Sequence, residues 1–339
     1  MPIDDTDDTD DTDDTDDASI DWHLLLLGLA GRMSDGAIAR CRGLLADRRL
    51  TDVRDELIKA VLGEGAPLFP GEVEFLEETR GVTGETVERL SGIEVTDNEV
   101  PVGYRFAEST SGTDRKDRAV IRSAVALVGT RGLWRSRRLA AAGAASPGAG
   151  RVYLVEADED ADLVAITGDI QRALRTIGRD QPRVEVYPTG LDLPDYHRLA
   201  RAHGELLWSR EPDPGVRVAV LFDAVDPPLG PRFRPDHPRA DQEARAELVD
   251  YLRRGSALLL TTGRLVDVVD HTRGRVVPTS YRTDGRWVWS DATTYYLESH
   301  GLLADPDLLT HIRAQRHTAP VVDDVGMHRA MLALRQLAG

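Results

Sequence analysis

Cysteine is nearly absent from this chain, since Cys41 is the only one among 339 residues. A single thiol excludes an intramolecular disulfide and cannot by itself form a thiolate metal site. Long apolar runs are missing as well. The longest near the N-terminus, residues 24–30, is far too short to span a bilayer, and no basic region of the signal-peptide kind precedes it. These absences predict a cytoplasmic protein with no membrane partner.

The common motifs of catalysis and cofactor binding are missing too. The first predicted strand of the α/β part, residues 151–157, leads into an acidic stretch rather than a glycine-rich loop. This excludes a dinucleotide fingerprint and a P-loop at that position. The sequence also has no Gly-x-Ser-x-Gly elbow and no His-Glu-x-x-His pair. No bound cofactor is therefore indicated, although a ligand pocket is not excluded.

Positive charge comes almost entirely from arginine, because Lys59 and Lys116 are the only lysines among 42 basic residues. The net charge of −16 is uneven: residues 1–17 contain ten aspartates and no basic residue, which leaves −6 for the rest. This stretch repeats Asp-Asp-Thr and offers nothing apolar to bury, so we expect residues 1–19 to be a disordered acidic tail. It lacks the turn glycine and bidentate glutamate of an EF-hand calcium loop.

Composition divides the remaining chain into three parts. Residues 20–92 carry apolar side chains at helical spacing, with Ser34 as one predicted N-cap, and form a helical module. Residues 93–150 are a connector that contains a basic helix and ends in an Ala/Gly-rich linker. Such a composition is typical of a domain boundary, which we place in residues 140–150. Residues 151–339 form an α/β domain.

The α/β domain is organised around residues 216–225, a Val-rich run that is apolar on both faces. Such a run is typical of a strand covered on both sides in a parallel sheet. Strands and helices alternate around it, which predicts right-handed crossovers and a mostly parallel, doubly wound, Rossmann-like sheet. The predicted strands are 151–157, 184–187, 216–225 and 257–261, and the predicted helices are 160–177, 193–208 and 240–253.

A hairpin and further helices complete the predicted domain. Asp284-Gly285 lies between two short strands and signals a tight type I′ turn, so we expect both residues to be exposed. The aromatic residues that follow form either a small core or a partner-binding surface, and the core is favoured. Trp287 and Trp289 share one face of a strand. The cluster comprises Trp287, Trp289, Tyr295 and Tyr296.

Part of this region resembles other sequences. The resemblance is carried by three segments: Ser280-Tyr281-Arg282-Thr283-Asp284-Gly285, Trp287-Val288-Trp289 and Tyr295-Tyr296-Leu297. They look like the C-terminal part of uncharacterised actinobacterial proteins. The similarity covers less than a tenth of the chain, and it brings no established activity with it.

A candidate catalytic site follows from the predicted parallel sheet, because ligands of such sheets bind beyond the carboxyl ends of the strands. There Asp223 and Asp226 offer carboxylates for Mg²⁺, while a hydroxyl and an arginine could take an anionic substrate. The long loop 226–238 contains five prolines and His237, a candidate general base. The candidate residues are Glu156, Asp223, Asp226, Thr262, Arg264 and His237.

Residues 115–138 hold eight basic residues against one acid, Asp117, and predict either a nucleic-acid contact or a solvated helix face. Trp134 is the only aromatic among them, and the chain is acidic overall, which weighs against nucleic acid.

Three functional hypotheses remain. The leading one is a protein-interaction or regulatory protein that uses the aromatic cluster at 287–296 or another surface. The second is an enzyme that acts on an anionic small molecule, phosphorylated or nucleotide-like, at the sheet edge. The third is a nucleic-acid-associated protein that uses residues 115–138.

Overall fold

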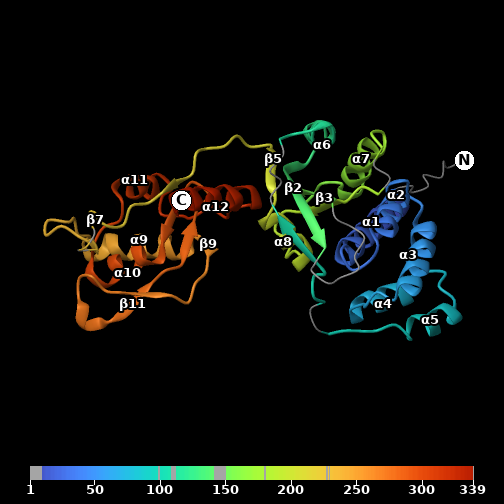
Figure 1. Cartoon of the computed structure of the whole chain (residues 1–339), viewed down its shortest axis with the longest axis horizontal. Helices are drawn as coiled ribbons and strands as arrows, with labels where there is room; N and C mark the ends of the chain where they lie inside the picture. The colour runs from blue at the N-terminus through green and yellow to red at the C-terminus, as the bar shows by residue number, and fades with distance from the viewer. Residues whose placement is uncertain are drawn as a thin grey trace, which may run out of the picture. The chain divides into compact units, whose positions relative to one another are not determined.

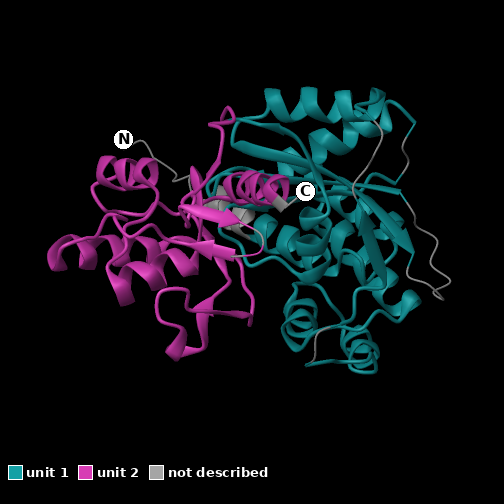
Figure 2. Ribbon diagram, turned by 60° about the vertical axis from the view of Figure 1, so that its left-hand side comes forward, with its two compact units in different colours: residues 1–210 teal, residues 211–339 magenta. Residues whose placement is uncertain are grey.

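The computed structural model describes residues 10–97, 100–107, 112–140, 150–178, 181–226, 228 and 230–338. It is a mixed α/β fold in two compact units, Met1–Arg210 and Glu211–Gly339 (Figures 1 and 2). The sequence predicts the boundary at 140–150 instead. Residues 141–149 lie outside the described residues, and the strands on either side of them pair with each other within one unit. No helix among the described residues is long and apolar enough to cross a membrane.

Unit 1 begins with helices that build one apolar core. The hydroxyl of Ser34 caps the second helix by accepting from the Ala37 amide, as predicted, and Thr83 caps the fifth in the same way. Leu26, Val53 and Leu76 are among the fully buried side chains of this core. The helices are α1 (Asp10–Leu29), α2 (Asp35–Ala46), α3 (Leu50–Glu64), α4 (Pro70–Glu78) and α5 (Gly84–Leu90).

Helix α1 starts inside the acidic repeat. Residues 10–17, expected to be disordered, are helical, whereas residues 1–9 lie outside the described residues. The apolar residues that follow, from Trp22 to Leu29, anchor the helix in the core of unit 1.

The sheet of unit 1 has the order β1-β2-β3-β4, with β5 also paired to β2. Only β3 and β4 are parallel, so the sheet is mixed rather than mostly parallel as predicted. Helices α6 and α7 pack on one face, and α8 lies on the other (Figure 1). The elements are β1 (Tyr104–Ala107), α6 (Arg115–Ala126), β2 (Thr130–Ala140), β3 (Gly150–Ala157), α7 (Leu163–Arg175), β4 (Val184–Pro188), α8 (Asp195–Ala202) and β5 (Glu205–Ser209).

Strand β2 is the largest difference in unit 1, because the sequence predicts a connector there. Its arginines suggested solvent, yet Arg135 and Arg138 are fully buried in ion pairs. The predicted helix 193–208 is likewise divided into α8 and β5. In β2, ion pairs with other elements override the local pattern, and residues 205–209 pair with β2 as a strand instead of continuing the helix.

Unit 2 contains a four-stranded sheet of order β6-β13-β12-β9, in which only β6 and β13 are parallel. Helices α9, α10 and α11 share a core with Trp287 and Trp289 on one face, and α12 packs against Val288 on the other. The strands are β6 (Arg217–Val218), β7 (Ala224–Asp226), β8 (Gly230–Arg232), β9 (Ser256–Leu259), β10 (Arg264–Val266), β11 (Arg275–Pro278), β12 (Tyr281–Thr283) and β13 (Trp287–Ser290). The helices are α9 (Gln242–Arg254), the 3₁₀ turn η1 (His271–Arg273), α10 (Asp291–His300), α11 (Pro306–Ala314) and α12 (Asp324–Ala338).

The run 216–225 is not a central strand, which corrects the sequence-based architecture. It contributes the two-residue edge strand β6 and the start of β7, and Val220 and Val225 are 65% and 67% exposed. Its other apolar residues pack into three separate small clusters. A continuous apolar run indicates that its side chains are buried. Burial does not require a strand, because an irregular segment can also place its side chains in several clusters.

The predicted hairpin is present, since β12 pairs antiparallel with β13 around Gly285, whose φ is +82°. The predicted type I′ turn is wrong, because Gly285 has a positive φ and Asp284 does not. Positive φ favours glycine at this position. Asp284, however, is only 3% exposed, against the expectation of an open turn. Its carboxylate accepts hydrogen bonds from the Tyr251 hydroxyl (2.6 Å), from His311 Nε2 (2.8 Å) and from two backbone amides. These bonds hold the turn against α9 and α11.

Candidate anion-binding site

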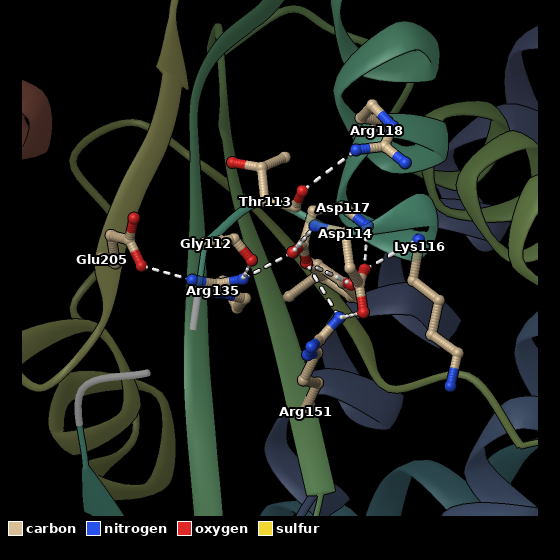
Figure 3. A network of polar contacts seen from close by, with 10 residues as sticks. Gly112, Thr113, Asp114, Lys116, Asp117, Arg118, Arg135, Arg151 and Glu205 are labelled. Carbon is tan, nitrogen blue, oxygen red and sulfur yellow. Dashed lines mark hydrogen bonds and ion pairs between the residues drawn. The ribbon is translucent and has the colours of Figure 1, made fainter. Parts of the chain in front are cut away.

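A buried carboxylate, Asp117, lies at the centre of a polar network on the α6 face of the unit 1 sheet (Figure 3). Its Oδ2 accepts from Arg135 Nη1 at 2.5 Å. Its Oδ1 accepts from the Tyr153 hydroxyl at 2.8 Å and from Arg151 Nη1 at 3.2 Å. Arg135 also pairs with Glu205 at 2.5 Å. One carboxylate therefore connects α6 with the neighbouring strands β2 and β3.

The start of α6 explains why Asp117 points at the sheet. Asp114 is the N-cap, and its Oδ1 accepts from the amides of Lys116 (2.8 Å) and Asp117 (3.1 Å). In the reverse direction, the Asp117 Oδ2 accepts a hydrogen bond from the Asp114 amide at 3.0 Å. This reciprocal capping box fixes the first turn of the helix. Lys116, between the two carboxylates in sequence, then extends away from them (Figure 3).

Asp114 is ionised at neutral pH. Burial by itself raises the pKa of this carboxyl, but the hydrogen bond from Arg151 and those from the helix amides outweigh it and lower the pKa to about 2. The Asp114–Arg151 ion pair spans 2.7 Å. Arg151 is thereby held between Asp114 and Asp117, and the position of its guanidinium is set by two carboxylates.

Next to this network is a pocket of about 210 Å³ at the amino ends of β3 and β4. Three basic side chains from separate elements line it: Lys116 of α6, Arg151 of β3 and Arg183 just before β4. Tyr153 adds a polar side chain. Apolar surface comes from Leu174 of α7 and from Pro182, and Gly150 completes the lining. The pocket thus combines positive charge with a short apolar wall.

The three cations differ in their partners. Arg183 pairs with Asp35 through Nη2 at 2.6 Å, while its Nε and Nη1 are buried and have no hydrogen-bond partner among the described residues. Arg151 is paired as described above. For the half-buried Lys116, no carboxylate of the described residues lies within ion-pair distance of the ammonium. Lys116 is therefore the basic group in this pocket whose charge is least compensated.

Asp35 links the pocket to a second buried network on the α8 face of the sheet. It also accepts from Arg138 at 2.5 Å, and Arg138 donates to the Tyr196 hydroxyl at 3.0 Å. Nearby, Arg42 of α2 forms a double ion pair with Glu185 of β4. Burial raises the pKa of Glu185, but the adjacent Arg42 guanidinium and other partners lower it well below its ordinary value. These pairs fasten the N-terminal helices to the sheet within unit 1.

The candidate residues from the sequence are divided between the two units, and of these residues Asp223 and His237 contact each other. Glu156 is a fully buried residue of β3 in unit 1, where its Oε1 accepts from the Thr189 hydroxyl at 3.0 Å. The other five, Asp223, Asp226, Thr262, Arg264 and His237, belong to unit 2. The hypothesis assumed a parallel sheet with 216–225 at its centre.

The Asp223 and Asp226 carboxylates are each paired with an arginine, and for Asp223 this is the Arg234 guanidinium, whose Nε lies 3.7 Å away. Asp223 accepts from His237 Nδ1 at 2.9 Å and from the Arg234 amide at 2.7 Å, and Asp226 pairs with Arg232 at 2.5 Å. His237 Nε2 lies 2.9 Å from the Leu303 carbonyl, so both ring nitrogens are engaged. Within the described ranges, no group of three or more His, Cys, Asp or Glu residues is placed to hold a metal ion. The structure therefore offers the expected Mg²⁺ site no geometric support.

The basic section 115–138 does not form one positive surface. Arg135 and Arg138 are buried in the ion pairs above, and Arg131 pairs with Asp158 at 3.0 Å. Exposed arginines remain on α6 and at Arg137. A nucleic-acid contact needs several cations that can reach phosphates together, and burial removes part of this set.

The aromatic cluster at 287–296 lies mainly inside unit 2. Trp287, Trp289 and Tyr296 are 5%, 0% and 1% exposed. Tyr295 is half-buried, and its hydroxyl donates to Asp267 at 2.9 Å. This is the placement expected of a small core.

Asp267 is a buried carboxylate that the sequence gave no reason to single out. Its Oδ2 accepts from His300 Nε2 at 2.7 Å as well as from Tyr295, and its Oδ1 accepts from the amides of Val269 and Asp270. Burial raises the pKa of this carboxyl, but the bonds from His300, the two amides and Tyr295 lower it to about 2, from an ordinary 3.8.

This depressed pKa predicts a loss of stability in acid. A carboxyl whose pKa is lower in the folded than in the unfolded state stabilises the fold above its unfolded pKa, and the contribution is lost as the pH falls through the folded pKa. We expect Asp267→Asn to be less stable than the parent chain above pH 3.8, with the difference shrinking as the pH falls to about 2. Urea denaturation over this pH range measures it. Asp236→Asn, at an exposed carboxylate, is the control, and a difference that does not change with pH would contradict the prediction.

Comparisons of the chain with protein-family models, with curated proteins and with solved structures give no match.

Proposed function

We propose that unit 1 binds a small anionic molecule in the pocket formed by Lys116, Arg151, Tyr153 and Arg183. The observation that carries the proposal is the convergence of three basic side chains from separate elements on one cavity of about 210 Å³. Cations placed by α6, β3 and the residue before β4 repel one another unless an anion or fixed carboxylates compensate them. The fixed carboxylates compensate two of the three, which leaves Lys116 for the ligand.

The ligand is an anionic small molecule, as in the sequence-based enzyme hypothesis. Its site, however, is at the amino ends of the strands β3 and β4 and not at carboxyl ends. The pocket is smaller than the roughly 300–1,000 Å³ typical of sites for drug-sized ligands, so a nucleotide would not fit within it. No nucleophile or general base is assigned. The proposal is therefore one of binding, and it leaves the reaction, where there is one, unspecified.

The test is a thermal-shift and calorimetric titration of the full chain with small anions at constant ionic strength. A ligand that binds only the folded state raises its stability by mass action, by about 2.7 kcal/mol at 100 times its Kd. Lys116→Gln should abolish the response of the pocket. Lys59→Gln removes the only other lysine of the chain and should leave the response intact. Equal responses in both variants, or none in the parent chain, would refute the proposal.

A second candidate function, protein interaction, is favoured by exposed apolar side chains in unit 2. Leu260 is 71% and Leu265 48% exposed, and Val269 and Val276 are exposed nearby in sequence. Large exposed apolar areas on soluble domains commonly mark contact surfaces. Sedimentation velocity over a wide concentration range tests for self-association. Leu260→Ser should weaken it without lowering the melting temperature, and a parent chain that stays monomeric throughout would remove self-association as the use of this surface.

A further inference from the structure

We propose that unit 1 has a second anion site, a groove between α3 and α5 that binds the dianion of a phosphate monoester. The groove has a volume of about 470 Å³ and is larger than the pocket of Lys116, Arg151 and Arg183, here the Lys116 pocket. Ligand sites typically measure roughly 300–1,000 Å³. Lys59 of α3 and Arg89 of α5 line the groove from its two sides. Among the described residues none lines both cavities, so the two sites are independent of each other.

Two cations of the groove have no partner. Lys59 and Arg89 are exposed, and neither side chain forms an ion pair or a hydrogen bond with the residues that the structure describes. The other charged residues of the lining, Arg54 and Asp55, pair with each other, since Arg54 Nη2 lies 2.7 Å from Asp55 Oδ1. Asp55 is the only carboxylate among the described lining residues. The lining therefore carries two positive charges that none of its own carboxylates compensates.

Arg54 is bound to fixed partners and holds the groove together. Its Nε donates to Asp55 at 2.8 Å, and its Nη1 donates to the Arg80 carbonyl at 2.7 Å. Gly81, which follows Arg80 and lines the groove, has a φ of +89°, and a Cβ there would collide with Arg54 Nη1. Arg54 therefore ties α3 to the segment that leads into α5, and this contact keeps the two sides of the groove close to each other.

A hydroxyl group of the lining can add a hydrogen bond to the ligand. Thr83 Oγ1 and Thr86 Oγ1 lie 3.0 Å apart, and Thr83 Oγ1 also accepts from the Thr86 amide at 3.3 Å. One hydroxyl proton makes the bond between the two side chains. The other has no acceptor among the described residues, and both threonines line the groove. The groove thus offers a neutral donor in addition to its two cations.

This set of donors matches a phosphate monoester better than a carboxylate. At pH 8 a monoester carries nearly two negative charges on three terminal oxygens, since its second pKa is about 6. Arg89 can bind two of these oxygens with its planar fork of N–H groups, and the Lys59 ammonium supplies the second positive charge. A monoanion would leave one of the two cations uncompensated. Leu62 and Val82 also line the groove and are only half-buried, so the organic part of the ester has a surface to contact.

The experiment is a calorimetric titration of the full chain with phenyl phosphate, benzenesulfonate and inorganic phosphate at pH 8 and constant ionic strength. Benzenesulfonate has a similar ring and three terminal oxygens, but it carries one negative charge. Inorganic phosphate carries the charge but lacks the organic part. We expect phenyl phosphate to bind tightest, and the other two anions to bind about tenfold more weakly.

Lys59→Gln and Arg89→Gln should each weaken the binding of phenyl phosphate by about tenfold or more, the usual effect of losing a hydrogen bond to a charged group. Lys59→Arg should retain binding, because the positive charge is kept. Lys116→Gln is the matched control and should leave the affinity unchanged, since Lys116 does not line the groove. Lys59 and Arg89 form no bond with the described residues, so their variants should melt at the temperature of the parent chain.

Three outcomes would overturn the inference. Phenyl phosphate does not bind, or it binds Lys59→Gln and Arg89→Gln as tightly as the parent chain, and then the groove is not a site. Benzenesulfonate or inorganic phosphate binds as tightly as phenyl phosphate, and then the groove does not select a monoester dianion. Binding is lost in Lys116→Gln but not in Lys59→Gln, and then the ester occupies the Lys116 pocket, which would support the proposed function instead.

Discussion

Replacing Arg42 with methionine is expected to lower the free energy of unfolding by about 3–5 kcal/mol, because the change leaves a buried carboxylate without its main partner. Arg42 is 2% exposed, and its guanidinium donates to both oxygens of Glu185, at 3.0 and 2.6 Å, and to the Val184 carbonyl at 2.8 Å. After the change, the hydrogen-bond partner left to the Glu185 carboxylate among the described residues is His197 Nε2, at 3.0 Å. Urea denaturation of the full chain measures the loss.

Arg40→Met is the matched control, since Arg40 lies on the same helix but its side chain is 59% exposed and pairs with Glu56 on the surface. Exposed pairs are worth about 0–1 kcal/mol, so this change should have little effect. The double variant Arg42→Met, Glu185→Met should recover much of the stability, because both charges are then removed together. If Arg42→Met costs no more than Arg40→Met, the buried pair does not fasten α2 to the sheet.

Replacing Trp289 with alanine is expected to destabilise unit 2 by about 3–5 kcal/mol, the usual cost of removing a large aromatic side chain from a core. Trp289 is fully buried, its Nε1 donates to the Leu252 carbonyl at 3.1 Å, and its ring lies 6.0 Å from that of Tyr251. The side chain therefore joins β13 to α9. Urea denaturation of the variant and of the parent chain measures the difference in the free energy of unfolding. Near-UV circular dichroism is the signal, because it comes from packed aromatic rings.

Leu260→Ala is the control for this prediction. Leu260 is 71% exposed, and surface substitutions of this kind usually change stability by no more than about 0.5 kcal/mol. If the Trp289→Ala chain melts at the same temperature as the parent chain, Trp289 does not stabilise the core of unit 2. The aromatic cluster would then be a candidate partner-binding surface.

Much of the secondary structure could be predicted, because it depends on residues close together in the chain. The predicted helices 160–177 and 240–253 correspond to α7 and α9, whose N-caps Asp162 and Asp241 accept from amides three residues on. The predicted strands 151–157 and 184–187 correspond to β3 and β4. Asp305-Pro306 starts α11, with the Asp305 carboxylate accepting from two amides of the first turn.

The candidate site could be predicted only in part. Lys116 belongs to the basic section that the sequence marks, but its neighbours in the pocket are 35 and 67 positions away in the chain, at Arg151 and Arg183. A signal for them does exist: both parallel strands are entered through an Arg-Val pair, and neighbouring parallel strands bring their starts to one edge.

The sequence by itself determined where helices begin, where the hairpin turns and which strands are apolar, since caps, glycine conformations and side-chain periodicity act over a few residues. Only the tertiary structure decided how buried charges are paired and which strands are neighbours. Arg42 and Glu185 are 143 positions apart, and Arg135 meets Asp117 across a helix–sheet interface. From sequence alone, an arginine on a strand is expected to be solvent-exposed, because the carboxylate with which it forms an ion pair is not known. That partner is fixed by the free energy of the whole fold, because a buried charge is tolerated only where another element supplies the opposite one.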